Sequence, residues 1–167
     1  MIYSRKLSGI VPVVVTTLNE DQSVDQESQD KLMKFLNYSG VGGYWCLGTG
    51  SEDMNLTFEN RLLIAKILCK SNNGKLPLIL GAGFYCMEDT LNFIDETSNL
   101  NFDAYHVMPY HPKLSMSLLV DYYKKIADFS NKPIWLYTSA NWCQSFKPDF
   151  VEELMHYKNI AGIKFSS

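Results

Sequence analysis

Short runs of apolar residues alternate with longer amphipathic stretches along the whole chain. The first run, from Ile10 to Thr16, is rich in β-branched residues and lies between Gly9 and a polar segment at 19–23. This pattern predicts a strand that is buried on both faces. Similar runs follow at regular intervals, and each is bounded by Gly, Pro or polar residues that mark turns. The expected strands cover residues 10–16, 43–47, 76–80, 104–108, 133–137 and 160–165.

The stretches between these runs have apolar residues at helical spacing. In the first stretch these residues are Leu32, Phe35 and Leu36, and Gly40 follows where helices often end with a positive φ. The expected helices cover residues 25–38, 88–100, 118–129 and 149–157, and one more opens at 57 and ends in the turn at 72–74. Strict alternation of strands and helices in short units predicts a parallel sheet with helical crossovers.

Two α/β architectures have this pattern. The chain has 167 residues, which suits an open, doubly wound sheet, because a closed eight-stranded β/α barrel typically takes about 250 residues. In both architectures, the loops that follow the strands line the face on which active sites lie. Chain length thus favours the open sheet, whereas the motifs at the strand ends, described below, favour the barrel.

Composition and charge exclude several classes of protein. A hydrophobic content of 46% and a charged content of 20% are typical of a globular domain. The net charge of −3 disfavours binding to nucleic acid or to an anionic membrane surface. No apolar run is long enough to span a bilayer, and the N-terminus lacks the apolar core of a signal peptide, so we expect a cytoplasmic protein.

The cysteines and histidines show no metal-binding pattern. The four cysteines never form a C-x-x-C pair, and His106, His111 and His156 have no spacing typical of metal ligands. We therefore expect reduced thiols and no metal site. The sequence also lacks the Gly-rich phosphate-binding motifs that open helices in nucleotide-binding proteins, so an open-sheet nucleotide binder is the weakest of the alternatives.

Lys164 carries the clearest chemical signal. It interrupts the otherwise apolar strand expected at 160–165, so its amine either reaches solvent at the strand end or lies in a site that needs it. In general, desolvation lowers the pKa of a lysine and leaves more neutral amine to attack a ketone.

Two further segments have both a chemical and a plain structural interpretation. Tyr137, at the end of the neighbouring strand, has a phenol that can relay protons, although it also fits an interior aromatic residue. Thr49 and Gly50 lie in a small-residue turn whose amides suit a carboxylate, although such turns are common without a ligand.

Taken in order, these segments resemble the dihydrodipicolinate synthase and N-acetylneuraminate lyase family of Schiff-base-forming β/α barrels. The resemblance extends over all 167 residues. The matching segments are 9–11 with 16–17 and 23–25, Gly48-Thr49-Gly50-Ser51-Glu52 with 56–57, 76–83, Pro109-Tyr110, 132–137 and 159–164. Each segment is weak evidence alone, but their order and spacing make the match specific.

The resemblance implies a fold, a reaction and a set of site residues. The fold would be a (β/α)8 TIM barrel of which residues 1–167 form the N-terminal portion of a single domain, with the first six strands and five helices. Lys164 would form an imine with pyruvate or another 2-oxo acid, and Tyr137 would shuttle protons. The resemblance further implies that no metal or organic cofactor is used and that the protein forms dimers or tetramers. The residues expected to bind the substrate are Thr49, Gly50, Ser51 and Tyr110.

The chain departs from the family pattern at three loops. Gly50 follows Thr49 where a second hydroxyl or small polar residue is usual, and His111 follows Tyr110 where an aromatic pair is common. Trp142 stands where the dihydrodipicolinate synthases carry an arginine that holds a carboxylate. We therefore expect an aldolase or lyase other than dihydrodipicolinate synthase itself.

The alternative is a non-catalytic family member or fragment that serves assembly or ligand binding. The family barrel continues beyond the lysine strand for two more strands, whereas this sequence ends at Ser167. An arc of six strands would expose strand edges, so we expect the isolated piece to be poorly stable unless another chain or segment covers it.

Overall fold

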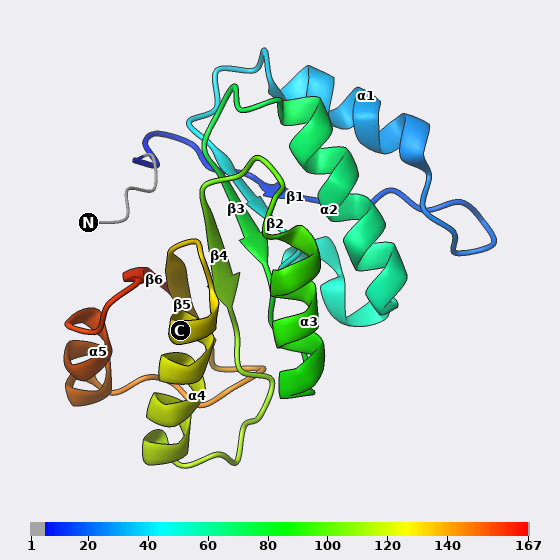
Figure 1. The fold of residues 1–167 in the computed structure, drawn as a ribbon. Coiled ribbons are helices and arrows are strands. Elements are labelled where there is room, and N and C mark those ends of the chain that lie inside the picture. The colour runs from blue at the N-terminus through cyan, green and yellow to red at the C-terminus, as the bar shows by residue number, and fades with distance from the viewer. Residues whose placement is uncertain (1–5, 167) are drawn as a thin grey trace. The chain divides into compact units, whose positions relative to one another are not determined.

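The computed structural model describes residues 6–166, and parallel strands alternate with helices throughout (Figure 1). The helices are α1 (Gln26–Leu36), α2 (Phe58–Asn72), α3 (Met87–Thr97), α4 (Met116–Phe129) and α5 (Pro148–Met155). The strands are β1 (Val13–Val14), β2 (Tyr44–Cys46), β3 (Leu78–Gly81), β4 (Ala104–Val107), β5 (Ile134–Ser139) and β6 (Ile160–Ser166). Every expected strand and helix is present, with ends that differ by a few residues.

The order of the strands distinguishes the two architectures that the sequence allowed. The sheet runs β1-β2-β3-β4-β5-β6, in the order of the chain. A doubly wound sheet reverses its strand order at a switch point, whereas the strands of a β/α barrel follow one another in sequence. The observed order is therefore that of a barrel.

The chain divides into two compact parts. The N-terminal part runs up to Gly81 and includes Asn99–Asp103, and the C-terminal part comprises Ala82–Ser98 and the residues from Ala104 onward. In the N-terminal part, α1 and α2 lie side by side (Figure 1), and the Asn37 side chain donates a hydrogen bond to the Ser71 carbonyl (3.0 Å). Thr57 caps α2 as the sequence predicts, because its hydroxyl accepts a hydrogen bond from the Asn60 amide.

In the C-terminal part, tyrosine hydroxyls join the helices to the sheet by hydrogen bonds. The Tyr105 hydroxyl on β4 donates to the Ile94 carbonyl of α3, and the Tyr123 hydroxyl on α4 donates to the Val107 carbonyl of β4. Burial raises the pKa of the Tyr123 phenol well above its ordinary value, so this group stays protonated and acts as a fixed donor. The candidate catalytic side chains project from the opposite face of the sheet.

Two expectations about burial are wrong. Only one face of β1 is covered, since Val14 is buried while Val13 is 40% exposed and Val15 is 53% exposed. On α1, Phe35 is exposed, and the helix instead buries Met33 and, one turn before it, Gln29. Gln29 is buried there because its side-chain oxygen accepts a hydrogen bond from the Thr17 amide (2.9 Å), a long-range contact that periodicity does not reveal.

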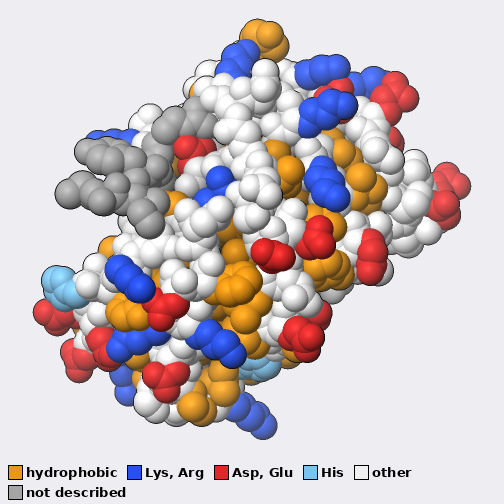
Figure 2. All heavy atoms as spheres, viewed as in Figure 1, with side chains coloured by type: hydrophobic (Ala, Val, Ile, Leu, Met, Phe, Trp, Pro, Cys, Tyr) orange, Lys and Arg blue, Asp and Glu red, His pale blue; other side chains and the backbone are white. Residues whose placement is uncertain are grey.

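Charged side chains of both signs are interspersed on the face drawn in Figure 2. Among the described residues, Lys34 pairs with Asp30 on α1, and Lys124 pairs with Glu153 between α4 and α5. None of the helices between residues 6 and 166 has the length and apolarity that crossing a membrane requires.

Candidate active site

Lys164 and Tyr137 lie together on the C-terminal part of the sheet. They are register partners on the adjacent strands β6 and β5, and partners on parallel strands project from the same face. The Lys164 Nζ atom lies over the Tyr137 ring, 3.8 Å from its centroid. Tyr137 is buried and Lys164 is half-buried.

A β-bulge places Lys164 on this face. Ile134 pairs with Ile160, but the next residue, Trp135, pairs with Gly162, so Ala161 is an extra residue on β6. Since side chains alternate between the two faces of a strand, one extra residue moves every later side chain to the opposite face. Without the bulge, Ile163 would stand opposite Tyr137 and Lys164 would point toward the helices.

Glycine is required at position 162 in this register, because the Trp135 ring of the neighbouring strand lies where a side chain would begin. A Cβ atom at Gly162 would lie 2.8 Å from two atoms of that ring. We therefore expect Gly162→Ala to lower the free energy of unfolding by about 1 to 3 kcal/mol, the usual cost of overpacking. Urea denaturation measures this change. The matched control is Ala161→Ser at the exposed neighbouring position, and an equal loss in both variants would contradict the steric explanation.

His106 is a buried polar side chain of this face that our sequence analysis considered only as a metal ligand. It is 2% exposed, and its ring meets the Tyr137 ring edge-on, with centroids 5.5 Å apart and planes at 81°. His106, Tyr137 and Lys164 thus follow one another across β4, β5 and β6. The signal that sequence reasoning missed is a histidine inside an apolar strand, the same kind of signal that singled out Lys164.

Tyr110 follows β4 and belongs to a group of aromatic rings in the C-terminal part. It stacks on Tyr85 (6.1 Å, 24°) and meets Trp142 edge-on (6.3 Å, 89°). His111 contacts Tyr85 edge-on, and its Nε2 atom lies 2.6 Å from the Tyr85 carbonyl oxygen. We call Tyr85, Tyr110, His111 and Trp142 the aromatic patch.

The backbone beside Tyr110 requires a glycine at position 83. A Cβ atom on Gly83 would lie 2.5 Å from the Met108 carbonyl oxygen and 3.3 Å from the Tyr110 ring. The loop after β3 therefore approaches the end of β4 closely, which allows Tyr85 to reach Tyr110.

Thr49, Gly50 and Ser51 form a short 3-10 turn in the N-terminal part, directly after β2. Thr49 is half-buried and Gly50 is exposed, whereas Ser51 is 1% exposed. The Ser51 hydroxyl donates to the Val14 carbonyl (2.6 Å), and the Thr16 hydroxyl donates to the Ser51 carbonyl (2.8 Å). Ser51 therefore anchors the turn to the residues around β1, and Thr49 and Gly50 are its accessible members.

Backbone strain is present on both sides of this turn. Leu47 and Glu52 have φ values of 52° and 58°, in the left-handed region that side chains other than glycine rarely adopt. Leu47 is buried and Glu52 is exposed. Strain of this kind persists where the surrounding structure imposes it, and it is frequent at binding sites.

Relieving the strain at Glu52 is expected to stabilise the protein. Glycine adopts this conformation without cost, so we expect Glu52→Gly to raise the free energy of unfolding by about 1 kcal/mol. Glu52→Ala is the control, because it removes the same carboxylate but keeps a Cβ atom. Thermal denaturation distinguishes the two variants, and a similar gain for both would assign the effect to the charge instead of the backbone.

A buried ion pair supports the same segment. Arg61 on α2 and Asp53 after the turn are each 2% exposed, with 3.8 Å between the guanidinium and the carboxylate. Arg61 also donates a hydrogen bond to the Gly81 carbonyl at the end of β3 (3.3 Å). The pair links the turn after β2 to α2 and β3 within the N-terminal part.

The buried cysteine of β2 is inert, and the acidic side chains of the described residues are not grouped as metal ligands. The Cys46 thiol lies on β2 next to Leu47, and burial raises its pKa well above the ordinary value, so it stays protonated. Among residues 6–166, no group of three or more His, Cys, Asp and Glu side chains is arranged to hold a metal ion.

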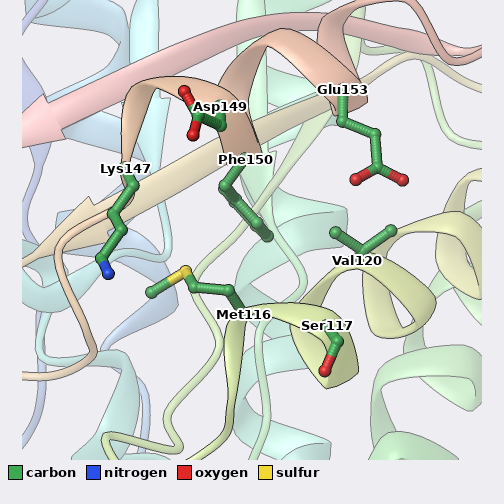
Figure 3. Close-up of a pocket in the computed structure, with 7 residues that line it drawn as sticks. All are labelled: Met116, Ser117, Val120, Lys147, Asp149, Phe150 and Glu153. Atoms are coloured by element: carbon green, nitrogen blue, oxygen red, sulfur yellow. The ribbon is translucent and has the colours of Figure 1, made fainter.

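A separate cavity of about 350 Å³ lies between α4 and α5 (Figure 3). Its lining mixes apolar and charged side chains: Met116, Ser117, Val120, Lys147, Asp149, Phe150 and Glu153. Glu153 is already paired with Lys124 (2.7 Å). The cavity contains none of the residues that the sequence singled out, so we do not assign the chemistry to it.

Comparison with known proteins shows the family of this chain. The sequence model of the Dihydrodipicolinate synthetase family matches residues 6–167. The chain belongs to this family. The 4-hydroxy-tetrahydrodipicolinate synthase of Laribacter hongkongensis (strain HLHK9) is 30% identical over 164 residues, which are 95% of this chain and 55% of that synthase.

Solved structures of the family agree with the fold. YagE from Escherichia coli K12, in complex with pyruvate, has a TM-score of 0.88 and 30% identity over 93% of this chain and 53% of YagE. N-acetylneuraminate lyase from Proteus mirabilis has a TM-score of 0.91 and 28% identity over 98% of this chain and 57% of the lyase. The six parallel strands and five helices are thus part of a TIM barrel, and the chain spans about half the length of these relatives.

Proposed function

We propose that the protein is a lyase or aldolase in which Lys164 forms a Schiff base with pyruvate or another 2-oxo acid. The observation that carries the proposal is the Lys164 amine over the Tyr137 ring, on adjacent strands and on one face of the sheet. The pyruvate complex of YagE supports the choice of a 2-oxo acid. The family includes synthases and lyases by name, so the family alone leaves the exact reaction open.

The proposed reaction begins with the neutral amine. Nζ attacks the ketone carbon, the carbonyl oxygen takes a proton, and the carbinolamine loses one water molecule to give a protonated imine. The Tyr137 phenol delivers and removes these protons. The imine then accepts the electron pair left when a proton leaves the adjacent methyl carbon, which yields an enamine.

The enamine carbon forms the new carbon–carbon bond in the synthetic direction. Its electron pair attacks the carbon of an aldehyde, and the aldehyde oxygen becomes a hydroxyl by taking a proton. Water then hydrolyses the imine, releases the product and regenerates the Lys164 amine. Cleavage runs through the same steps in reverse and needs no metal or organic cofactor.

The other predicted site residues have supporting roles in this proposal. We assign the carboxylate of the 2-oxo acid to the turn of Thr49, Gly50 and Ser51, as the family resemblance implies. Within this turn, the exposed Gly50 and the half-buried Thr49 are the members that solvent reaches. Tyr110 is assigned to substrate binding in the C-terminal part.

The proposal extends to the assembly of the protein. Residues 1–167 would be the N-terminal portion of a single β/α barrel domain that acts in the cytoplasm as a homo-oligomer, either a dimer or a tetramer. Analytical ultracentrifugation tests the assembly, and a stable monomer would argue against it.

Borohydride trapping tests the chemistry directly. Incubation with pyruvate and sodium borohydride is expected to add the mass of pyruvate less one oxygen atom, because reduction makes the imine permanent. Peptide mapping should place this mass on Lys164. If no adduct forms with pyruvate or with several other 2-oxo acids, the alternative of a non-catalytic family member, which the altered loops after Thr49 and Tyr137 favour, replaces this proposal.

A further inference from the structure

The Tyr137 ring is contacted from both strands that neighbour β5 in the C-terminal part. His106 lies on β4 and Lys164 lies on β6, on either side of β5 in the sheet. The His106 ring meets the Tyr137 ring edge-on, with centroids 5.5 Å apart, and the Lys164 Nζ atom lies 3.8 Å from the Tyr137 centroid. Both rings are at most 3% exposed. Tyr137 is therefore held on the β4 side by a side chain that itself has little room to move.

His106 belongs to the row of residues next to Tyr137 and Lys164. It pairs with Trp135, and Trp135 pairs with Gly162, so these three residues form one row across β4, β5 and β6. Tyr137 and Lys164 form the next row on the same face, two residues further along their strands. The Trp135 ring lies where a Cβ atom of Gly162 would be, on the β6 side. This leaves the β4 side of Tyr137 to His106.

The position of the phenol oxygen depends on how the Tyr137 ring is held. Rotation about the first side-chain torsion swings the whole ring, and the hydroxyl at its far end moves furthest. A proton relay needs its oxygen within hydrogen-bond reach of the group that gains or loses the proton. A displacement of about 1 Å can cost about a hundredfold in rate. A side chain that fixes Tyr137 can therefore control the rate without taking part in the chemistry.

We propose that His106 is a positioning residue whose ring holds the Tyr137 phenol in place for proton transfer at Lys164. The inference rests on the proposed function and adds a residue to it. The ring is the part of His106 that acts, since its contact with Tyr137 is an edge-on contact between two flat rings. A ring without nitrogen atoms at position 106 serves this purpose, whereas a polar side chain without a ring does not.

The test measures how fast the full chain exchanges the methyl protons of pyruvate for deuterium in D2O, followed by proton NMR. This exchange requires only the imine and the enamine, so it needs no aldehyde, and Lys164→Ala gives the background rate. His106→Asn keeps a polar group and removes the ring. We expect its kcat to fall by about tenfold to a hundredfold while KM for pyruvate changes by less than about twofold, because positioning acts on the transition state.

Matched variants separate the ring from the nitrogen atoms and from histidine loss in general. His106→Phe keeps a flat ring and is expected to retain most of the wild-type kcat. His156→Ala removes an exposed histidine at the end of α5 and should exchange at the wild-type rate. Melting temperatures show which variants are folded.

A double-mutant cycle with Tyr137→Phe separates positioning from a general loss of packing. If His106 acts through the Tyr137 hydroxyl, His106→Asn costs nothing further in a protein that already lacks this hydroxyl. We therefore expect the double variant to have the kcat of Tyr137→Phe. A purely structural role would lower kcat by the same factor in both backgrounds. The cycle decides the question even if His106→Phe overpacks the site and does not fold.

The outcomes distinguish this inference from the function on which it rests. With Lys164 labelled by pyruvate and borohydride, wild-type exchange in His106→Asn or additive losses in the cycle would overturn the role of His106 alone. A folded His106→Phe that is as slow as His106→Asn would also overturn it, because the nitrogen atoms would then be required. Absence of any Lys164 adduct in the wild type would overturn both proposals.

Discussion

Replacement of Lys164 by alanine is expected to abolish aldol activity, with a loss of at least about a thousandfold in kcat. The imine depends on this one nitrogen, and enzymes that lose their nucleophile typically retain only the small rate enhancement from binding. Pyruvate-dependent borohydride labelling should disappear in the same variant. Both measurements use the full chain.

Lys164→Arg separates catalysis from stability. Arginine keeps a cation that can lie over the Tyr137 ring but has no amine able to form the imine. We expect a melting temperature close to that of the wild type together with the same loss of activity. Lys158→Ala, which removes the exposed partner of Asp128, should remain active. Full activity in Lys164→Arg would reject the Schiff base.

Tyr137→Phe is the second variant with a large expected effect. It removes the phenol oxygen but keeps the ring that lies beneath Lys164 and against His106. Loss of a positioned proton relay typically costs about a hundredfold to ten-thousandfold in rate. We expect a loss of kcat in this range and a slower, though still detectable, formation of the borohydride adduct at Lys164.

The control for this variant is Tyr157→Phe. The Tyr157 hydroxyl donates a hydrogen bond to the exposed Asp128 carboxylate (3.0 Å), outside the proposed site. Its removal should leave kcat unchanged. If Tyr137→Phe were as active as Tyr157→Phe, the protons would have to pass through another group, and His106 beside Tyr137 would be the first to examine.

Periodicity predicted the elements well because each strand and helix is defined by its own local pattern. The expected strand at 104–108 corresponds to β4 at Ala104–Val107, and Thr57 caps α2 as its position in the sequence suggests. Burial of individual side chains was harder to predict. Ile10 and Phe35 are apolar but exposed, since burial depends on what packs against a residue from elsewhere in the chain.

The strand-end chemistry was also partly visible in the sequence. Lys164 stood out as a charge in an apolar strand, and its order relative to Tyr137 and Thr49 carried the family resemblance. Ser51 shows the limit of that reasoning, because its hydroxyl donates to the Val14 carbonyl, a bond between residues far apart in the chain. The contact between His106 and Tyr137 was not predicted either, because these residues are also far apart in the chain.

The sequence alone determined that strands and helices alternate, which segments they occupy and which family the order of motifs resembles. These properties depend on neighbouring residues, whose spacing sets hydrophobic periodicity and turn formation. Only the tertiary structure decided that the strands follow one another in chain order, and that Lys164 faces Tyr137. The second result depends on the extra residue at Ala161, because the side of a sheet on which a residue lies is fixed by its pairing with the next strand.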